Sequence, residues 1–444
     1  MALKALDIYK LLPKKNCKEC GDPTCLTFAM KLASGKGDIE KCPYLDDHAK
    51  SVLGASTKPP VRKIKIGVGE RAFVVGEEFV QFRHEKTFYH PPGIMVSVSD
   101  TQTKPEIEQI VTNVRDYVLT RIGMDLRLNG IAIRNDSNNP EQFGTAVSYA
   151  EGCADLPVVL MAGTLAAAEA GLHECGNYRP IVHCATRENY REYCSLTKKS
   201  GAVLAIRAGT PDEMAELSTL CTEAGQDALL LDLSSRSLRQ FINDSTIIRQ
   251  HAITRTTPSL GYPVFYDATI PDNADAALVL GILKYGAVIV IGPPTRPSEK
   301  ALLTLRQNIY TDPQKPIQMT AGLYRVGNPG KDAPVLMTVN FSLTYFTLQG
   351  YLESSRVSCY MLIVDTEGLS VLTAVAAGKL NETMVRDAIK KYGVENEVSH
   401  RTLIIPGYAS PLSGRIEEET GWKVLVGPRD AAEIGEYLET EWKA

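Results

Sequence analysis

Residues 16–45 read NCKECGDPTCLTFAMKLASGKGDIEKCPYL, and their four cysteines decide how the start of the chain folds. The pattern is Cys17-x2-Cys20-x4-Cys25-x16-Cys42, and a proline follows the last cysteine. Four thiolates in one small unit can close a metal site, and both zinc and a cubane iron-sulfur cluster use four such ligands. Zinc ribbons usually pair two C-x2-C knuckles, whereas a final Cys-Pro is typical of cluster-binding runs. The spacing therefore favours a [4Fe-4S] cluster, with zinc and inert buried thiols as the alternatives.

Two short helices are expected around these cysteines. The stretch TCLTFAMKLASGKG is expected to form one of them and to end at Gly35 and Gly37. The other is LDIYKLLP, whose apolar residues at helical spacing are Leu6, Tyr9 and Leu12. Helices of this length bury too little surface to be stable alone, so metal binding would supply folding free energy. Residues 54–63 have the composition of a linker, and we expect the cluster domain to span residues 1–57.

From residue 64 the sequence changes to short apolar runs separated by longer amphipathic stretches. A hairpin, KIKIGVG then AFVVGEEFVQF, is expected first. EIEQIVTNVRDYVL (106–119) is typical of the helices that follow, because its apolar residues share one face. Eight strands alternating with helices predict a (β/α)8 TIM barrel over residues 58–325, with an open doubly wound sheet as the competing geometry. The expected strands are 94–98, 130–133, 158–161, 181–184, 203–206, 228–231, 264–266 and 287–291.

The last part of the chain is expected to form a separate domain. GLYRVGNPGKDAPV (322–335) is rich in glycine and proline and is interpreted as a second linker. Strands and helices then alternate, which predicts an open α/β sheet over residues 326–444. Its strands are expected at 335–341, 360–364, 402–405 and 424–426. The predicted fold class is thus α/β, with a small helical cluster domain, a central barrel and a C-terminal open sheet.

Composition excludes several classes of protein. The 444 residues carry 48 basic and 52 acidic side chains, so the strongly basic surface of a nucleic-acid binder is absent. The sequence has no run of 18 apolar residues and begins with a polar stretch, so we expect a cytoplasmic protein without a membrane partner. Six cysteines are scattered singly and are expected to be small buried apolar residues: Cys153, Cys175, Cys184, Cys194, Cys221 and Cys359.

The cysteine motif, followed by a barrel and a small α/β domain, resembles the large (gamma) subunit family of the corrinoid iron-sulfur proteins of the acetyl-CoA (Wood-Ljungdahl) pathway. The likeness extends over essentially the whole chain. Its specific part is the three-domain order together with MTVNFSLTYF (337–346) and TEGLSVLTAVAAGK (366–379). The resemblance implies that Cys17, Cys20, Cys25 and Cys42 hold a [4Fe-4S] cluster, and that the C-terminal domain holds a cobalt corrinoid of the cobalamin type.

The resemblance also implies a function, that of the methyl-carrying component of a methyltransferase system. The cobalt would accept a methyl group from methyltetrahydrofolate through a separate methyltetrahydrofolate:corrinoid methyltransferase and pass it to acetyl-CoA synthase/CO dehydrogenase. The cluster would reactivate Co(II) to Co(I), and the chain would work in a heterodimer with a small (delta) subunit. Two other functions remain open, an iron-sulfur electron-transfer protein and a stand-alone pterin methyltransferase barrel.

Ligands of open α/β sheets bind at the carboxyl ends of the strands. The loops expected there contain small residues, which let a flat macrocycle approach the backbone, and polar groups that can bond its amides. Simple strand-end turns are the alternative. With the resemblance added, we predict that these residues contact the corrinoid: Asn340, Thr344, Phe346, Gly368, Ser370, Val371, Leu372, Thr373, Gly407, Tyr408, Ala409, Ser413, Gly427, Pro428 and Arg429.

Many corrinoid domains carry D-x-H-x-x-G, whose histidine is the lower cobalt ligand. The C-terminal domain has His400 without the other motif residues, and Asp46-Asp47-His48 lacks the glycine. We therefore predict a base-off corrinoid without a protein histidine on cobalt, which would make reduction easier. By resemblance, Thr373 is the catalytic candidate below the cobalt face.

Four polar residues follow expected barrel strands: Asp100, Asn135, Asp232 and Asp267. Barrel active sites occur at this end of the strands, and pterin-binding barrels use Asp and Asn there. For these four residues we expect a structural or docking role, with pterin binding as the alternative.

Overall fold

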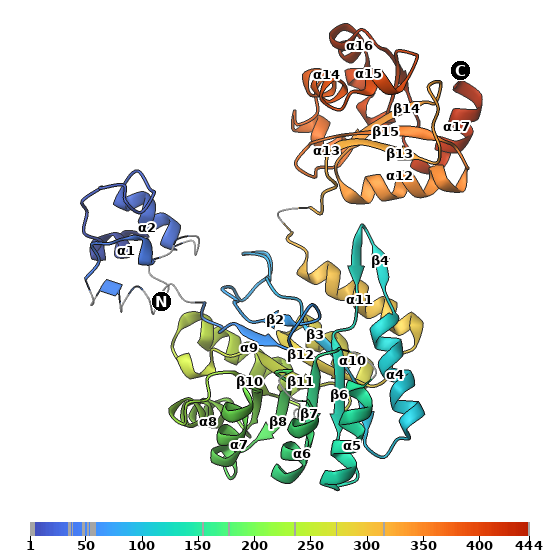
Figure 1. Ribbon diagram of the computed structural model, residues 1–444. Helices are drawn as coiled ribbons and strands as arrows, with labels where there is room; N and C mark the ends of the chain where they lie inside the picture. Colours follow the sequence, from blue (N-terminus) through green and yellow to red (C-terminus); the bar gives the residue numbers. More distant parts are fainter. Residues whose placement is uncertain are drawn as a thin grey trace. The chain divides into compact units, whose positions relative to one another are not determined.

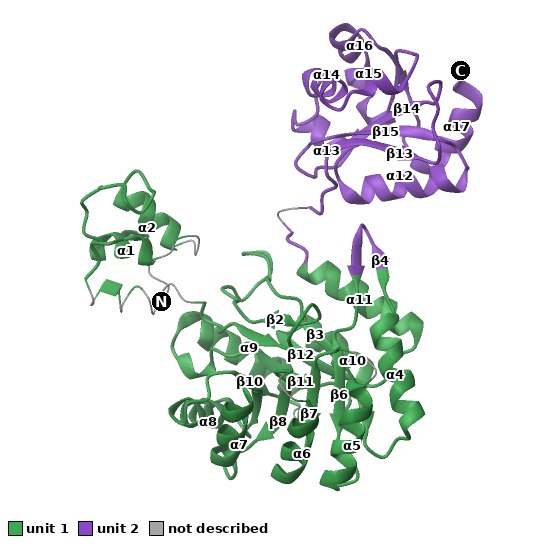
Figure 2. Cartoon of the chain, viewed as in Figure 1, with its two compact units in different colours: residues 1–119, 126–310 green, residues 120–125, 311–444 purple. Residues whose placement is uncertain are grey.

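The computed structural model describes residues 5–33, 37, 39–46, 49–50, 53, 59–152, 155–175, 178–234, 237–271, 273–313 and 316–442. The chain forms two compact units (Figure 2): one holds residues 1–119 and 126–310, and the other holds 120–125 and 311–444. Within the described ranges, no helix is both long enough and apolar enough to cross a membrane. Several expectations lie outside these ranges, namely the helix end at Gly35, Asp47 and His48, Cys153, and residues 54–58 of the first linker.

Both expected N-terminal helices are present, as α1 (Ala5–Leu11) and α2 (Cys25–Ala33), and a 3-10 turn, η1 (Ile39–Lys41), follows them. Their small core contains apolar side chains from both helices together with Cys25 and Cys42. Leu6, one of the residues at helical spacing, lies outside this core and is 65% exposed. Ile8 of α1 and Leu12, directly after its end, are the buried apolar residues of this segment.

The barrel is confirmed, and the competing open sheet is excluded (Figure 1). Eight parallel strands close on themselves: β3 (Gly93–Ser99), β6 (Gly130–Arg134), β7 (Val158–Met161), β8 (Ile181–Ala185), β9 (Val203–Arg207), β10 (Leu229–Asp232), β11 (Val264–Asp267) and β12 (Gly286–Ile291). The helices between and after them are α4 (Lys104–Asp116), α5 (Pro140–Glu151), α6 (Leu165–Cys175), α7 (Tyr190–Ser200), α8 (Pro211–Glu223), α9 (Leu238–Thr254), α10 (Ala274–Leu283) and α11 (Arg296–Tyr310).

Two hairpins precede or interrupt the run of barrel strands, and most of the second belongs to the other compact unit. The expected one consists of β1 (Ile64–Ile66) and β2 (Phe73–Val75), whose side chains join the core inside the barrel. The Gly67 amide donates a hydrogen bond to the Arg179 carbonyl just before β8, so this hairpin covers the N-terminal end of the strands. The second hairpin, β4 (Leu119–Arg121) and β5 (Met124–Leu126), was not foreseen, because we expected the helix to continue to residue 119.

The C-terminal sheet has five strands in the order β13-β15-β14-β16-β17. They are β13 (Gly322–Val326), β14 (Val335–Val339), β15 (Cys359–Val364), β16 (Thr402–Ile405) and β17 (Lys423–Val426). The expected linker at 322–335 is therefore partly wrong, since β13 pairs antiparallel with β15 along its whole length. Only the glycine- and proline-rich residues after β13 form a turn, and the second compact unit begins at Thr311.

Helices cover both faces of this sheet. Side chains of α12 (Ser342–Ser354) and α17 (Ile434–Glu441) pack in one core with Met361 and Ile363 of β15. Side chains of α13 (Val371–Ala376), α14 (Glu382–Lys391) and α16 (Ser413–Thr420) pack in the other core, with Leu362 and Val364 of β15. The remaining short elements are α15 (Val394–Glu397), η3 (Gly407–Leu412) and η4 (Ala431–Glu433). This is a doubly wound domain with one antiparallel edge strand.

Candidate functional site

The fold brings the four N-terminal cysteines together. Cys25 begins α2 and is buried, as is Cys42 after η1, whereas Cys20 is half-buried and Cys17 is exposed. Burial raises the pKa of Cys42, a hydrogen bond with the Tyr44 backbone lowers it, and the nearby Cys20, Cys25 and Cys17 raise it further. A thiol whose pKa is raised stays protonated more readily, and a bound cation would favour the deprotonated form that ligates metals. The donor set therefore fits a metal centre.

The loop before α2 is built to present Cys25. The Asn16 amide donates a hydrogen bond to Cys25 Sγ at 3.4 Å, and Asn16 Oδ1 accepts one from the Cys25 amide at 2.8 Å. Asn16 has a φ of 49° and Gly21 has a φ of 85°, so both residues adopt the left-handed conformation that asparagine and glycine tolerate. Amide bonds to ligand sulfurs are one means by which proteins set the potential of an iron-sulfur cluster.

The main cleft of the second unit lies at the carboxyl ends of β14 and β16. The chain leaves β14 for β15 on one side and later returns to β16 on the other side, so the strand order reverses between β14 and β16. Ligands of doubly wound sheets bind at such a reversal. The two strands pair only through Leu336 and Ile404, whereas β14 and β15 pair from Val335 to Val339. A cleft of about 500 Å³ opens where the strands separate.

More than half of the residues predicted to contact a corrinoid line this cleft: Thr344, Ser370, Val371, Leu372, Tyr408, Gly427, Pro428 and Arg429. The remaining lining residues were not predicted: Leu336, Met337, Thr338, Phe341, Leu343, Thr347, Leu348, Ile404, Ile405, Pro406, Asp430, Ala431 and Ile434. Most of these residues lie on β14, β16 and α12. They could have been predicted only from the order of the strands in the sheet, which a single sequence does not reveal.

Thr338 is the residue in this cleft that most clearly points to a polar ligand. Only 2% of it is exposed, and its hydroxyl has no hydrogen-bond partner. A buried polar group without a partner is costly, by about 1–3 kcal/mol. Around it, large apolar side chains stay exposed, namely Leu343 at 51%, Leu372 at 59% and Tyr408 at 45%. The cleft therefore fits a ligand with a wide apolar body and hydrogen-bonding groups, as a corrinoid has.

Asn340 does not line this cleft. Its side chain is buried, and Oδ1 accepts hydrogen bonds from the amides of Thr366 and Gly368 at 2.9 and 3.0 Å. Oδ1 also accepts from the Thr366 hydroxyl at 3.1 Å, and Nδ2 donates to Asp365 Oδ1 at 2.9 Å. The amide thus fixes the turn that leads into α13, instead of facing a ligand.

Replacing Asn340 with alanine is expected to destabilise the second unit by about 2–3 kcal/mol, because two buried backbone amides lose their acceptor. Urea denaturation of the full chain measures this loss. As a control, Asn328→Ala changes an exposed asparagine of the same unit and is expected to cost less than about 0.5 kcal/mol. Equal stability of the two variants would contradict the role given to Asn340.

Other predicted contacts shape the walls of the cleft. The Gly407 amide donates to the Pro428 carbonyl at 3.0 Å, and a Cβ at residue 407 would come within 2.9 Å of the Arg429 amide nitrogen. Ser413 Oγ donates to the Ser410 carbonyl at 2.9 Å. Three further predicted residues outside the cleft lining have other roles in the fold: Phe346 packs edge-on against Tyr345, Gly368 supplies a φ of 77°, and Ala409 is fully buried.

Thr373 and His400 are the two residues considered as ligands for the cobalt of a corrinoid. Thr373 is exposed on α13, and its Oγ1 lies 3.0 Å from Ser370 Oγ, at the edge of the cleft. His400 is engaged by the backbone at both ring nitrogens, because Nε2 donates to the Ala333 carbonyl at 2.9 Å and Nδ1 accepts from the Thr402 amide at 3.2 Å. This histidine has no ring nitrogen left for a metal.

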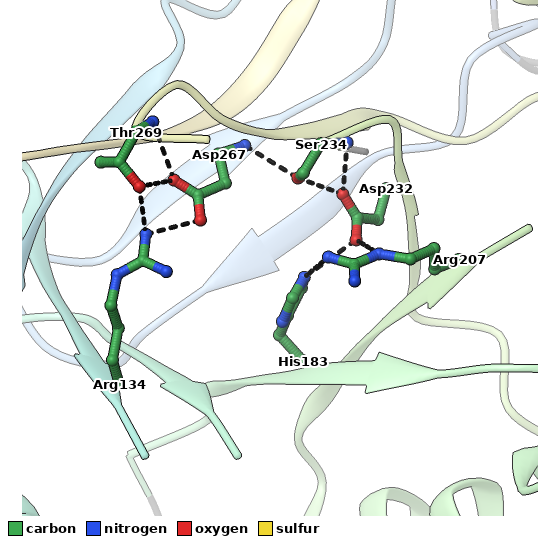
Figure 3. A network of polar contacts seen from close by, with 7 residues as sticks. All are labelled: Arg134, His183, Arg207, Asp232, Ser234, Asp267 and Thr269. Atoms are coloured by element: carbon green, nitrogen blue, oxygen red, sulfur yellow. Dashed lines mark hydrogen bonds and ion pairs between the residues drawn. The ribbon is translucent and has the colours of Figure 1, made fainter. Parts of the chain in front are cut away.

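At the C-terminal mouth of the barrel, Asp232 and Asp267 belong to one polar network (Figure 3). Asp232 Oδ2 accepts hydrogen bonds from His183 Nε2 at 2.9 Å and Arg207 Nε at 2.6 Å, and Oδ1 accepts from the amide and hydroxyl of Ser234. Asp267 Oδ2 accepts a hydrogen bond from Arg134 Nη2 at 2.5 Å, and Asp267 Oδ1 accepts from the amide and hydroxyl of Thr269. Both carboxylates are therefore saturated by the protein's own donors.

The other two mouth residues form a second small network. Asp100 accepts hydrogen bonds from Asn135 Nδ2 at 2.8 Å and from the amide and hydroxyl of Ser137. Asn135 Oδ1 is buried without a partner. His183, Cys184 and Asp232 could together hold a metal ion, but the Arg207 guanidinium already supplies positive charge at Asp232. The arrangement favours a structural role over an open substrate site.

Comparisons with known proteins identify the family of the chain. A family model described as CO dehydrogenase/acetyl-CoA synthase delta subunit matches residues 63–438, and an Fe-S cluster model matches residues 12–44. The chain is 39% identical to the corrinoid/iron-sulfur protein large subunit of Moorella thermoacetica, over 98% of both chains. It is 36% identical to the acetyl-CoA decarbonylase/synthase complex subunit gamma of Methanopyrus kandleri, over 99% of this chain and 98% of the relative.

The resemblance drawn from the cysteine motif and the C-terminal segments is thereby confirmed. The family match spans the barrel and nearly all of the open sheet, and the cluster match spans all four N-terminal cysteines. The chain belongs to the CO dehydrogenase/acetyl-CoA synthase delta subunit family.

Proposed function

We propose that this protein is a corrinoid and iron-sulfur methyl carrier, the methyl-carrying component of a methyltransferase system. One observation supports this most strongly: a four-cysteine centre and a cleft at the strand reversal, with the unpartnered hydroxyl of Thr338, occur in one chain. The names of the relatives point to the same two cofactors. The methyl donor would be methyltetrahydrofolate, served by a separate methyltransferase, and the acceptor would be acetyl-CoA synthase/CO dehydrogenase.

Each cofactor has a defined set of residues that would hold it. Cys17, Cys20, Cys25 and Cys42 would ligate a [4Fe-4S] cluster, whose chemistry is one-electron transfer. A bound corrinoid would supply the cobalt centre that carries the methyl group. The cleft residues would do the rest: Leu343, Leu372 and Tyr408 exclude water from the ligand, and Thr338 meets one of its polar groups.

The protein would hold the corrinoid without a histidine on the metal. His400 keeps both ring nitrogens on the backbone, which supports a base-off state. Thr373 remains the candidate residue below the cobalt, with the neighbouring Ser370 hydroxyl 3.0 Å away to orient its own. We also propose that the chain works in a heterodimer with a small subunit, and that residues 1–57 act as a separate cluster domain.

The test is metal analysis with spectroscopy on anaerobically purified protein, alone and with the small subunit. We expect about four iron and one cobalt per heterodimer, with a base-off visible spectrum. Iron without cobalt would favour the electron-transfer protein instead. Electron spin resonance that shows a nitrogen bonded to cobalt from the protein would contradict the absence of a histidine ligand.

A pair of matched variants tests the cleft itself. Thr338→Val removes the unpartnered hydroxyl but keeps the shape, so the cofactor-free protein should gain about 1 kcal/mol while corrinoid affinity falls by up to about tenfold. Ser342→Ala removes another buried hydroxyl without a partner, one that does not line the cleft. It should leave corrinoid affinity unchanged, and an equal loss in both variants would argue against the cleft as the binding site.

A further inference from the structure

The loop around Cys17 carries a concentrated positive charge. Residues 13–20 read PKKNCKEC, and Lys14, Lys15 and Lys18 are all exposed beside the exposed Cys17. Within the described part of the chain, none of the three lysines is seen to form an ion pair. Lys15 Nζ instead lies 3.9 Å from the centroid of the Tyr44 ring. The positive charges are therefore available to a partner.

Two other lysines of the same domain are paired with acidic residues. Lys10 Nζ lies 3.0 Å from Asp7 Oδ1, and Lys31 forms an ion pair with the buried Asp22. Glu19 is the one acidic residue in the loop, and its Oε1 accepts a hydrogen bond from the Tyr44 hydroxyl at 2.8 Å. Among the described residues of this domain, unpaired positive charge therefore gathers in the loop that presents Cys17, and the exposed Lys41 lies next to Cys42.

The backbone conformation at two of these lysines is uncommon for a long side chain. Lys14 has a φ of 57° and Lys18 has a φ of 65°, in the left-handed region where glycine and asparagine are preferred. Asn16, between them, has a φ of 49° and is a residue suited to it. Two long cationic side chains therefore occupy positions where glycine or asparagine would be favoured.

We propose that Lys14, Lys15 and Lys18 form the docking surface for a protein that carries single electrons and has an acidic face. This rests on the proposed function, because it needs the cluster. Cys17 is the exposed ligand, so a carrier docked on this loop reaches the cluster by its shortest route from solvent. The reduced carrier gives one electron to the oxidised cluster and leaves oxidised by one electron, with no bond made or broken. Opposite charges on the two surfaces speed their encounter.

The experiment is stopped-flow reduction of the holoprotein, in complex with its small subunit, by a reduced ferredoxin of negative net charge. The variant Lys14→Glu/Lys15→Glu/Lys18→Glu should lower the second-order rate constant at least about tenfold at low ionic strength, and added salt should shrink the difference. Reduced methyl viologen, a small cation, should react with this variant at least as fast as with wild type. Lys10→Glu, a charge reversal elsewhere on the domain, should change the ferredoxin rate less than about twofold.

A neutral variant separates charge from folding. Lys14→Asn/Lys18→Asn puts a preferred residue at both left-handed positions, so the protein should be at least as stable as wild type while ferredoxin reduces it more slowly. Unchanged ferredoxin rates in iron-replete variants would overturn the docking surface and leave the proposed function intact. Equal slowing with both reductants would also overturn it, because the lysines would then act only on the cluster itself. A wild-type preparation without iron would instead refute the proposed function.

Discussion

Replacing Cys25 with alanine is expected to lower the iron content from about four atoms per chain to less than about one. Cys25 is buried at the start of α2, and its amide and sulfur are both bonded to Asn16, so no exposed side chain can take its place. The small N-terminal core includes Cys25 and Cys42 themselves, so losing the metal removes part of its folding free energy. Iron and sulfide assays measure the first effect, and limited proteolysis of residues 1–57 measures the second.

The matched control is Cys194→Ala. Cys194 is also buried, but it lies on α7 against the barrel, far along the chain from the metal ligands. It should keep full iron and cost about 1 kcal/mol of stability. Cobalt content should be unchanged in both variants, since the corrinoid cleft belongs to another compact unit. Full iron in the Cys25 variant, or zinc in the wild type, would contradict the four-cysteine cluster.

The barrel could be predicted because its signal is local and repeated. Each strand is a short apolar run, and each intervening helix shows its own periodicity, so eight repeats leave few alternatives. The strand β13 was not predicted, because the residues after it have the composition of a linker. Glycine and proline after Val326 suggested a linker, although residues 322–326 lie at the edge of a sheet, where partial burial is enough for a strand.

The cleft could be predicted only in part, because its position depends on the order of strands in space. Loop residues such as Ser370 and Arg429 follow strands directly, so the carboxyl-end rule finds them. Thr338 lies within β14 and lines the cleft only because β16 separates from β14 there. Asn340 was predicted to contact the ligand but instead holds a turn. A sequence alone does not distinguish a side-chain amide that holds a turn from one that binds a ligand.

Replacing Asp232 with asparagine is expected to destabilise the barrel by about 3–5 kcal/mol, because His183 and Arg207 lose the buried charge that compensates them.

The loss of stability in this variant also depends on pH. Burial disfavours a charged His183, but Cys184 and Asp232 outweigh it and raise the pKa of His183 to about 10. Because the pKa of His183 is higher in the folded than in the unfolded chain, its protonation stabilises the fold fully below about pH 6.5, its unfolded pKa. This stabilisation is lost as the pH rises toward 10. Urea denaturation of wild type and variant across this range measures both effects.

The sign for Asp232 is opposite. Burial alone would raise its pKa, but His183 and Arg207 lower it well below its usual range. Its contribution is therefore present above about pH 4 and is lost only in stronger acid. The difference in stability between wild type and Asp232→Asn should be greatest from about pH 4 to 6.5 and should shrink as His183 loses its proton. Asp136→Asn, at an exposed neighbour of the same mouth, should cost less than about 0.5 kcal/mol at every pH. A constant difference up to pH 10 would show that His183 is neutral in the folded barrel, and Asp232 would then be held by Arg207 alone.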